Sequence, residues 1–215
     1  MWLSYYLALP HLELSVAAAA YYTIPLFITL FSALFIGVRV GSLGWIAVFV
    51  GFLGVLLILR PKAGDFNVYA SLPVLAAILY ALAMILTRTK CQDESPIILS
   101  AALNVAFILV GCIAALFISG LDAQYRVGFL LAPWTEMGSA EWLSMILLAG
   151  AILIGSVGTA IAYQNGPPSV IGTFDFAYVG FAVVWGVVFF SEFPDGMTLV
   201  GMALIVVAGI MSLKQ

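Results

Sequence analysis

The sequence predicts an all-α, polytopic integral membrane helix bundle, because its composition and its long apolar segments both require a lipid environment. Of its 215 residues, 65% are hydrophobic and 8% are charged, and the mean hydropathy is +1.21. Soluble domains are about 45–50% apolar and roughly a quarter charged. Seven basic and ten acidic side chains cannot cover the surface of a soluble protein of this size. The composition therefore excludes a soluble enzyme, a nucleic-acid-binding protein and a disordered chain.

Seven long segments with almost no charge predict seven membrane-spanning helices. A helix needs ~20 apolar residues to cross a hydrocarbon core of ~30 Å, and an open sheet would leave backbone groups without partners in lipid. The longest uncharged run is too long for one helix, and Pro167 and Pro168 divide it in two. The expected spans are about 13–36, 42–60, 68–88, 96–119, 142–163, 168–191 and 197–213.

The segment before the first span is apolar but too short to cross a membrane. It covers Trp2–Leu9 and ends at a Pro-His pair. One interpretation is the end of a helix whose beginning is absent. The other is a short interfacial segment anchored by Trp2, Tyr5 and Tyr6, because aromatic rings favour the membrane surface.

The connections between spans suggest an orientation. Most are short, and the long one, 121–141, is expected to be an amphipathic interfacial loop. Cytoplasmic loops carry more lysine and arginine than external ones, and a count by side places the C-terminus in the cytoplasm by a margin of one residue. The two sides carry Arg39, Arg88, Lys90 and Lys214 against Arg60, Lys62 and Arg126.

A faint internal repeat relates the blocks 13–60 and 168–213. At an offset of 155, Gly41 aligns with Gly196 and Gly54 with Gly209. The paired spans lie five crossings apart, and an odd number of crossings inverts the second copy, as in many secondary transporters. The alternative is a coincidence between two glycine-rich apolar segments.

Asp175 is the sharpest candidate for function. It lies seven residues after Pro168, about 10 Å into the span at helical rise. A carboxylate at that depth is costly unless it faces water, a cation or a partner, and such residues often mark a transport pathway. Its helical face continues through Tyr178, Ala182 and Trp185, which predicts a cavity wall for an organic solute or a proton. The alternative is a carboxylate close to the headgroups or neutralised by a neighbour.

Other polar side chains in the spans are candidates for substrate contact or for helix–helix packing, which hydroxyl and amide groups also serve. Pro25 lies in the middle of the first polar line, removes one backbone hydrogen bond and frees the carbonyl of Tyr21. The candidates are Ser15, Tyr22, Thr29 and Ser32 in the first span, Asn104 in the fourth, and Ser156, Thr159 and Tyr163 in the fifth.

Signatures of enzymes and cofactors are absent from the sequence. His11 is the sole histidine and lies outside the spans, so there is no intramembrane serine–histidine pair and no metal-ligand spacing. No DDxxD, HExxH or P-loop motif is present. Cys91 and Cys112 are expected to be free thiols. We therefore expect no enzymatic activity, no cofactor, no metal and no nucleic-acid partner.

Two stretches carry short, weakly specific motifs in a fixed order. Ala17–Pro61 has Pro-Leu-Phe in mid-helix and a glycine-rich helix that ends Leu-Arg-Pro. Ala162–Gly209 has a Phe-Asp-Phe segment, a Ser-Glu-Phe-Pro-Asp turn and a Gly-x-x-Leu-Ile helix. Together they resemble the corresponding parts of the two EamA repeats of the drug/metabolite transporter superfamily. Two departures are Val38, where the first repeat usually has glutamate, and Phe176, where the second has tyrosine; Asp175 and Glu192 keep the pattern.

The resemblance implies ten helices in two inverted five-helix repeats around a central cavity, in the inner membrane, with both termini cytoplasmic. Residues 1–61 would then be a partial first repeat, comprising the end of its third helix and its fourth and fifth, and residues 66–215 the second repeat. The chain would be N-terminally truncated, lacking two helices and most of a third.

The expected function is secondary transport of a small organic metabolite by alternating access. Asp175 would be the cation- or proton-coupled site, Tyr178, Trp185 and Tyr22 cavity walls, and Pro25 and Pro167–Pro168 bending points. The alternative is a non-transporting truncated paralogue or an assembly subunit. If the chain is truncated, transport would need a partner protein or a homodimer. A membrane enzyme is a third, more distant alternative.

Overall fold

The computed structural model describes residues 1–12, 14–37, 39–60, 68–122, 131, 136–191 and 193–214, without the side chains of Ser15 and Phe190. Within these ranges the regular structure is helical throughout. Six helices are long and apolar enough to cross a membrane, which confirms the predicted fold class. They are Val16–Ile36, Ser42–Leu59, Val68–Lys90, Pro96–Gly120, Ser139–Asn165 and Pro168–Phe189. The seventh predicted span is the shorter apolar helix Gly196–Ser212.

The helix boundaries differ from the predicted ones at two places. The fifth span begins at Ser139 rather than 142, so Glu141 lies in its first turn. The apolar start forms a helix over Trp2–Ala8, followed by a 3₁₀ turn over Leu9–His11. Most of the predicted loop 121–141 lies outside the described residues, as do Val38 and Glu192.

The chain divides into two compact units, Met1–Lys90 with Gly166–Gln215, and Cys91–Asn165. The second unit consists of α6 (Pro96–Gly120) and α8 (Ser139–Asn165). The first unit holds α1 (Trp2–Ala8), α2 (Leu14–Tyr21), α3 (Ile24–Phe31), α4 (Ser42–Leu59), α5 (Ser71–Lys90), α9 (Pro168–Phe174), α10 (Ala177–Phe190) and α11 (Gly196–Ser212). These units follow contacts in space, whereas the predicted repeats divide the chain along the sequence. The boundaries 1–61 and 66–215 therefore stay a prediction.

The first span is broken between α2 and α3, where the sequence predicts a disturbance. Pro25 has no N–H to donate to the carbonyl of Tyr21, so the regular ladder stops there. The backbone instead forms hydrogen bonds to the third residue back: Thr23 N–H donates to the carbonyl of Ala20 at 3.4 Å, and Leu26 N–H donates to that of Thr23 at 3.0 Å. The Thr23 hydroxyl also donates to the Ala20 carbonyl, at 2.6 Å. Side-chain and 3₁₀-type bonds thus satisfy backbone groups that the break leaves.

The sixth span is also broken, which the sequence analysis did not predict. α9 ends at Phe174, α10 begins at Ala177, and Asp175 and Phe176 form the turn between them. Asp175 N–H donates to the carbonyl of Gly172 at 3.2 Å, one residue closer than in a regular helix. The Thr173 hydroxyl donates to the Ser169 carbonyl at 3.0 Å, a bond of the kind that bends helices.

The two broken spans run antiparallel, and their breaks lie beside each other. Tyr22, at the first break, has its ring centroid 6.2 Å from that of Tyr178, one turn after Asp175. Further along, Ile28 of α3 packs on Gly172 of α9, where an added Cβ would lie 3.0 Å from the Ile28 side chain. The direction of this pairing brings two interruptions that are far apart in the sequence to one place.

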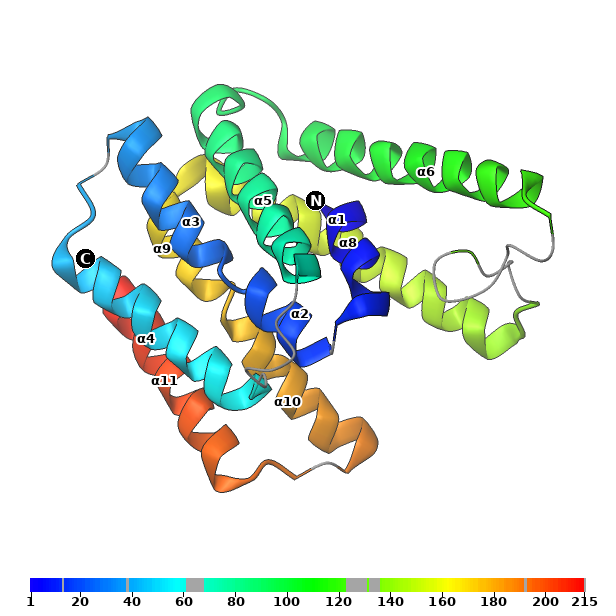
Figure 1. Cartoon of the computed structure of the whole chain (residues 1–215). Coiled ribbons are helices and arrows are strands. Elements are labelled where there is room, and N and C mark those ends of the chain that lie inside the picture. The colour runs from blue at the N-terminus through cyan, green and yellow to red at the C-terminus, as the bar shows by residue number, and fades with distance from the viewer. Residues whose placement is uncertain are drawn as a thin grey trace. The chain divides into compact units, whose positions relative to one another are not determined.

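A second antiparallel pair, α4 and α11, lies beside the broken spans. Figure 1 shows the cyan α4 and the red-orange α11 side by side, and α3 next to α9. An added Cβ on Gly54 would lie 2.7 Å from the carbonyl oxygen of Gly201, and one on Gly201 would lie 2.7 Å from that of Gly54. The two backbones therefore touch at a point where only glycine fits, as in other membrane helix pairs with small residues at the crossing.

The α4–α11 pair supports the second break directly. Phe176 is fully buried and its ring lies over Gly51 of α4, where an added Cβ would also meet Ala208 of α11. A cluster of buried side chains forms around this contact. It contains Tyr22, Val48, Val55, Phe176, Val179 and Ile205. The phenylalanine that replaces the expected tyrosine is thus a packing residue and not a polar group of the site.

The glycine crossing predicts a strong effect of small substitutions. Gly54→Ala and Gly201→Ala place a methyl group against a carbonyl oxygen, and overpacking of this kind costs about 1–3 kcal/mol. We expect either variant to melt several degrees below the native chain in detergent, measured by tryptophan fluorescence. Gly158→Ala in α8 is the control, because its Cβ meets no described atom within 4 Å. An unchanged melting temperature in both crossing variants would contradict the close approach.

Candidate functional site

Asp175 is placed by the second helix break, on the C-terminal end of α9. Its carboxylate is partly buried. Among the described residues of the six membrane-length helices and α11, the other charged side chains are Arg88, Lys90 and Glu141, and all three lie in a first or last turn. Asp175 is therefore the one described charge away from the ends of these helices. Its charge interacts electrostatically with the hydroxyls of Tyr21, Tyr22 and Tyr80, which come from α2, the first break and α5.

The three predicted cavity walls differ in exposure. Tyr22 is 9% exposed and belongs to the buried cluster, whereas Tyr178 is 70% and Trp185 54% exposed. Tyr178, Ala182 and Trp185 lie along one exposed face of α10, as the helical spacing predicted. Trp185 stacks on Phe189 at a centroid distance of 5.3 Å. The face is thus an open aromatic surface that starts at the Tyr22–Tyr178 contact and runs away from it.

Asn104, one of the two candidates in the second unit, contacts other residues of that unit. Asn104 donates to the carbonyl of Ser100 at 2.8 Å and lies 3.4 Å from the hydroxyl of Ser156. The Ser100 and Ser156 hydroxyls bond each other at 2.5 Å, which ties α6 to α8. Asn104 therefore takes part in a helix–helix contact, the alternative that the sequence left open. Tyr163 is 1% exposed.

The predicted hinge prolines all lie at helix starts. Pro25 is buried in the first turn of α3, beside the first break. Pro167 is the N-cap of α9 with an extended backbone, and Pro168 is the buried first residue of that helix. The predicted division of the longest apolar run is therefore confirmed, with α8 ending at Asn165. Whether the chain bends at these positions during a transport cycle stays a prediction.

Two hydroxyls of the first polar line are buried. Thr29 and Ser32 are both 0% exposed, and neither hydroxyl oxygen has a hydrogen-bond partner among the described residues. Ser32 opens a π-helical turn, Ser32–Ile36, which ends at Gly37 in the left-handed conformation. Elements of this kind are frequent at functional sites.

An apolar cavity of about 530 Å³ lies next to the first break. Its walls come from α2, α4 and α5, and small residues form much of them. They are Ala19, Ala20, Thr23, Phe52, Leu56, Ala70, Ser71, Val74, Leu75 and Ile78.

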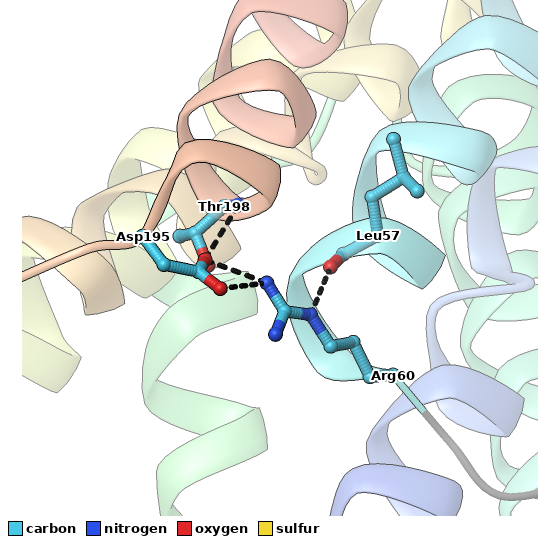
Figure 2. Close-up of polar contacts among 4 residues, drawn as sticks. All are labelled: Leu57, Arg60, Asp195 and Thr198. Atoms are coloured by element: carbon cyan, nitrogen blue, oxygen red, sulfur yellow. Dashed lines mark hydrogen bonds and ion pairs between the residues drawn. The ribbon is translucent and has the colours of Figure 1, made fainter.

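An ion pair joins the ends of α4 and α11 outside the apolar segments. Figure 2 shows Arg60 reaching the carboxylate of Asp195, with Nη2 2.6 Å from each oxygen, while its Nε donates to the carbonyl of Leu57. Asp195 is also the N-cap of α11 and accepts from Thr198 N–H at 3.0 Å. The hydrogen bond from Arg60, followed by those from Thr198, holds the pKa of Asp195 well below its usual range. The sequence alone does not predict this pair, although both residues stand in the quoted motifs Leu-Arg-Pro and Ser-Glu-Phe-Pro-Asp.

These features define a polytopic α-helical membrane protein with two discontinuous helices that meet beside an embedded carboxylate, a plan that recurs in secondary transporters. Residues 1–60 match the EamA-like transporter family. The chain is 28% identical to a riboflavin transporter of Vibrio cholerae over 188 residues, covering 86% of this chain and 58% of that protein. It is 28% identical to the pseudopaline exporter CntI of Pseudomonas aeruginosa over 206 residues, covering 95% and 67%.

A third relative, the S-adenosylmethionine uptake transporter of Rickettsia felis, is 26% identical over 196 residues, with 89% of this chain and 60% of that protein covered. These matches confirm the resemblance drawn from the sequence, which is to EamA-type proteins of the drug/metabolite transporter superfamily. The names of the family and of these relatives denote transporters or exporters, which confirms the expectation that it is not an enzyme.

The chain spans 58% to 67% of the length of these relatives. A crystal structure of another protein shares its fold, with a TM-score of 0.76 at 21% identity, covering 97% of this chain and 70% of that one.

The ion pair predicts a stability difference that depends on pH. Because the folded-state pKa of Asp195 is depressed, its stabilising effect is complete above the ordinary value of 3.8 and is lost as the pH falls below it. Arg60→Gln should therefore lower the melting temperature by about 1–3 °C at pH 7, since both side chains are exposed, and by less at high salt. The difference in melting temperature between the variant and the native chain should disappear below pH ~4. Lys90→Gln, which removes a charge from the end of α5, is the control. A difference in melting temperature that persists at pH 3 would contradict the stabilising role of the Arg60–Asp195 ion pair.

Proposed function

We propose that the chain is a secondary transporter that moves a small organic metabolite across the inner membrane by alternating access. The observation that carries the proposal is the meeting of two broken antiparallel spans beside Asp175. Discontinuous helices expose backbone dipoles and leave polar groups at membrane depth, and transporters bind substrates and coupling ions at such places. The relatives named for riboflavin, pseudopaline and S-adenosylmethionine support a small organic molecule as cargo.

In this proposal Asp175 binds the coupling cation or proton, and Tyr22, Tyr178 and Trp185 form the wall of the substrate site. The antiparallel course of α3 against α9 and of α4 against α11 supports two inverted repeats, with Pro25 and Pro167–Pro168 as bending points. We place the C-terminus in the cytoplasm on the count of basic residues. Asn104 and Tyr163 would act mainly by positioning α6 and α8.

A non-transporting membrane subunit is the second candidate. Saturable uptake of riboflavin or S-adenosylmethionine by the purified chain in proteoliposomes would exclude it. Uptake that appears only when a second membrane protein is added would favour it. Cross-linking in native membranes would show whether a homodimer is the transporting form.

Asp175→Asn tests the coupling role. The substitution keeps the size of the side chain and removes its charge, so we expect the flux of the transported substrate to fall by at least about tenfold and its dependence on the pH gradient to disappear. Flux is measured in proteoliposomes across an imposed pH gradient. Asp122→Asn at the end of α6 is the matched control and should leave both unchanged. Native flux with native pH dependence in Asp175→Asn would contradict the proposed coupling role.

A further inference from the structure

Buried hydroxyl groups gather where the first span, α9 and α11 meet. Among the described residues, seven serine, threonine and glutamine side chains are buried, and five of them belong to these three elements. They are Thr29, Ser32, Ser169, Thr173 and Ser212. A hydroxyl group that is buried away from water needs a hydrogen-bond partner, and inside a membrane the lipid offers none.

Two of these hydroxyls have partners on α9 and α11. The Thr173 hydroxyl donates to the carbonyl of Ser169 at 3.0 Å and accepts from the Ser212 hydroxyl at 3.2 Å. Protein groups therefore satisfy Thr173 and Ser212.

The hydroxyls of the first span differ from these two. Thr29 and Ser32 are fully buried, and neither hydroxyl has a hydrogen-bond partner among the described residues. Neither one donates to the carbonyl one turn back in its own helix, as Thr87 does to Ala83 in α5 at 3.0 Å. A buried hydroxyl without a partner is destabilising, because it has given up its bonds to water and gained none.

The two hydroxyls lie toward the same region. Thr29 and Ser32 are three residues apart on a helix, so their side chains are neighbours on one face. Ser32 lies one turn after Ile28, which packs on Gly172 of α9, and the antiparallel course puts Ser32 near the level of Ser169. The π-helical turn that begins at Ser32 interrupts the regular ladder of backbone bonds. Ordered water satisfies polar groups at such interruptions in membrane helices.

We propose that Thr29 and Ser32 bind an internal water molecule between α3 and α9. A water bonded to both hydroxyls and to one further polar group has the three or so partners that buried waters usually have. Water fits because each hydroxyl can both donate and accept, and two neutral groups offer no charge that would compensate an ion. The inference concerns the packing of the two broken spans, and it holds whether or not the chain transports a solute.

The sign of a stability change tests this inference. Thr29→Val and Ser32→Ala each remove a hydroxyl with little change in shape. If water bonds these groups, each variant loses hydrogen bonds, and we expect its melting temperature in detergent to fall by about 2–6 °C. Thr87→Val and Ser144→Ala are matched controls that remove exposed hydroxyls bonded within their own helices, and they should stay within about 1 °C. An unchanged or higher melting temperature in Thr29→Val or Ser32→Ala would overturn the inference.

X-ray radiolysis locates the water directly. It converts bound water into hydroxyl radicals, which oxidise the side chains beside it, and mass spectrometry identifies the oxidised residue. Ile28, next to Thr29 and one turn before Ser32, is compared with Val55 in the buried cluster, because both are 0% exposed. We expect Ile28 to be oxidised at least about fivefold faster than Val55 in the native chain, and within about twofold of it in the double variant Thr29→Val/Ser32→Ala. Equally slow oxidation of the two residues in the native chain would overturn the inference.

A cation in the same place is distinguished by the salt. The melting temperature of the native chain is compared in equal concentrations of sodium chloride and choline chloride, and bound water predicts the same value in both. A rise that is specific to sodium and lost in the double variant would replace the water by a bound cation and overturn the inference.

Discussion

The backbones of α4 and α11 touch at Gly54 and Gly201, and the position of Asp175 depends on that contact. The approach brings Gly51 of α4 close to Ala208 of α11, and the ring of Phe176 packs against Gly51. Phe176 directly follows Asp175 in the turn between α9 and α10, so a buried ring fixes the carboxylate from one side. Larger residues at the crossing would separate the two helices and disrupt the surface on which Phe176 packs.

A broken helix in lipid must satisfy the backbone groups that it releases. Here both breaks use the same two devices, backbone bonds one residue shorter than in a regular helix and a threonine hydroxyl that donates to a carbonyl of the preceding turn. Thr23 acts at the first break itself, and Thr173 just before the second. Because the spans run antiparallel, the two breaks lie side by side and pack against the same buried side chains. Tyr22 and Phe176 both belong to the buried cluster that fills it.

The predictable part of this structure is local in the sequence. The spans follow from hydropathy and length, and the break near Pro25 follows from a missing N–H, so each could be located without knowing the fold. The turn at Asp175 could not, because no proline or glycine stands at Asp175 or Phe176, and the features beside it are a side-chain bond from Thr173 and the packing of Phe176 on α4. The ion pair between Arg60 and Asp195 joins residues 135 positions apart, and only the antiparallel course of α4 and α11 brings them together.

The internal repeat proposed from glycines at an offset of 155 is better supported by elements than by residues. The breaks at Tyr22 and Asp175 are 153 positions apart, and the N-caps Gly41 and Asp195 of α4 and α11 are 154 apart. In the proposed repeat the two breaks carry different chemistry, a tyrosine in the first and a carboxylate in the second. The candidate site is therefore asymmetric, although the helices around it are paired.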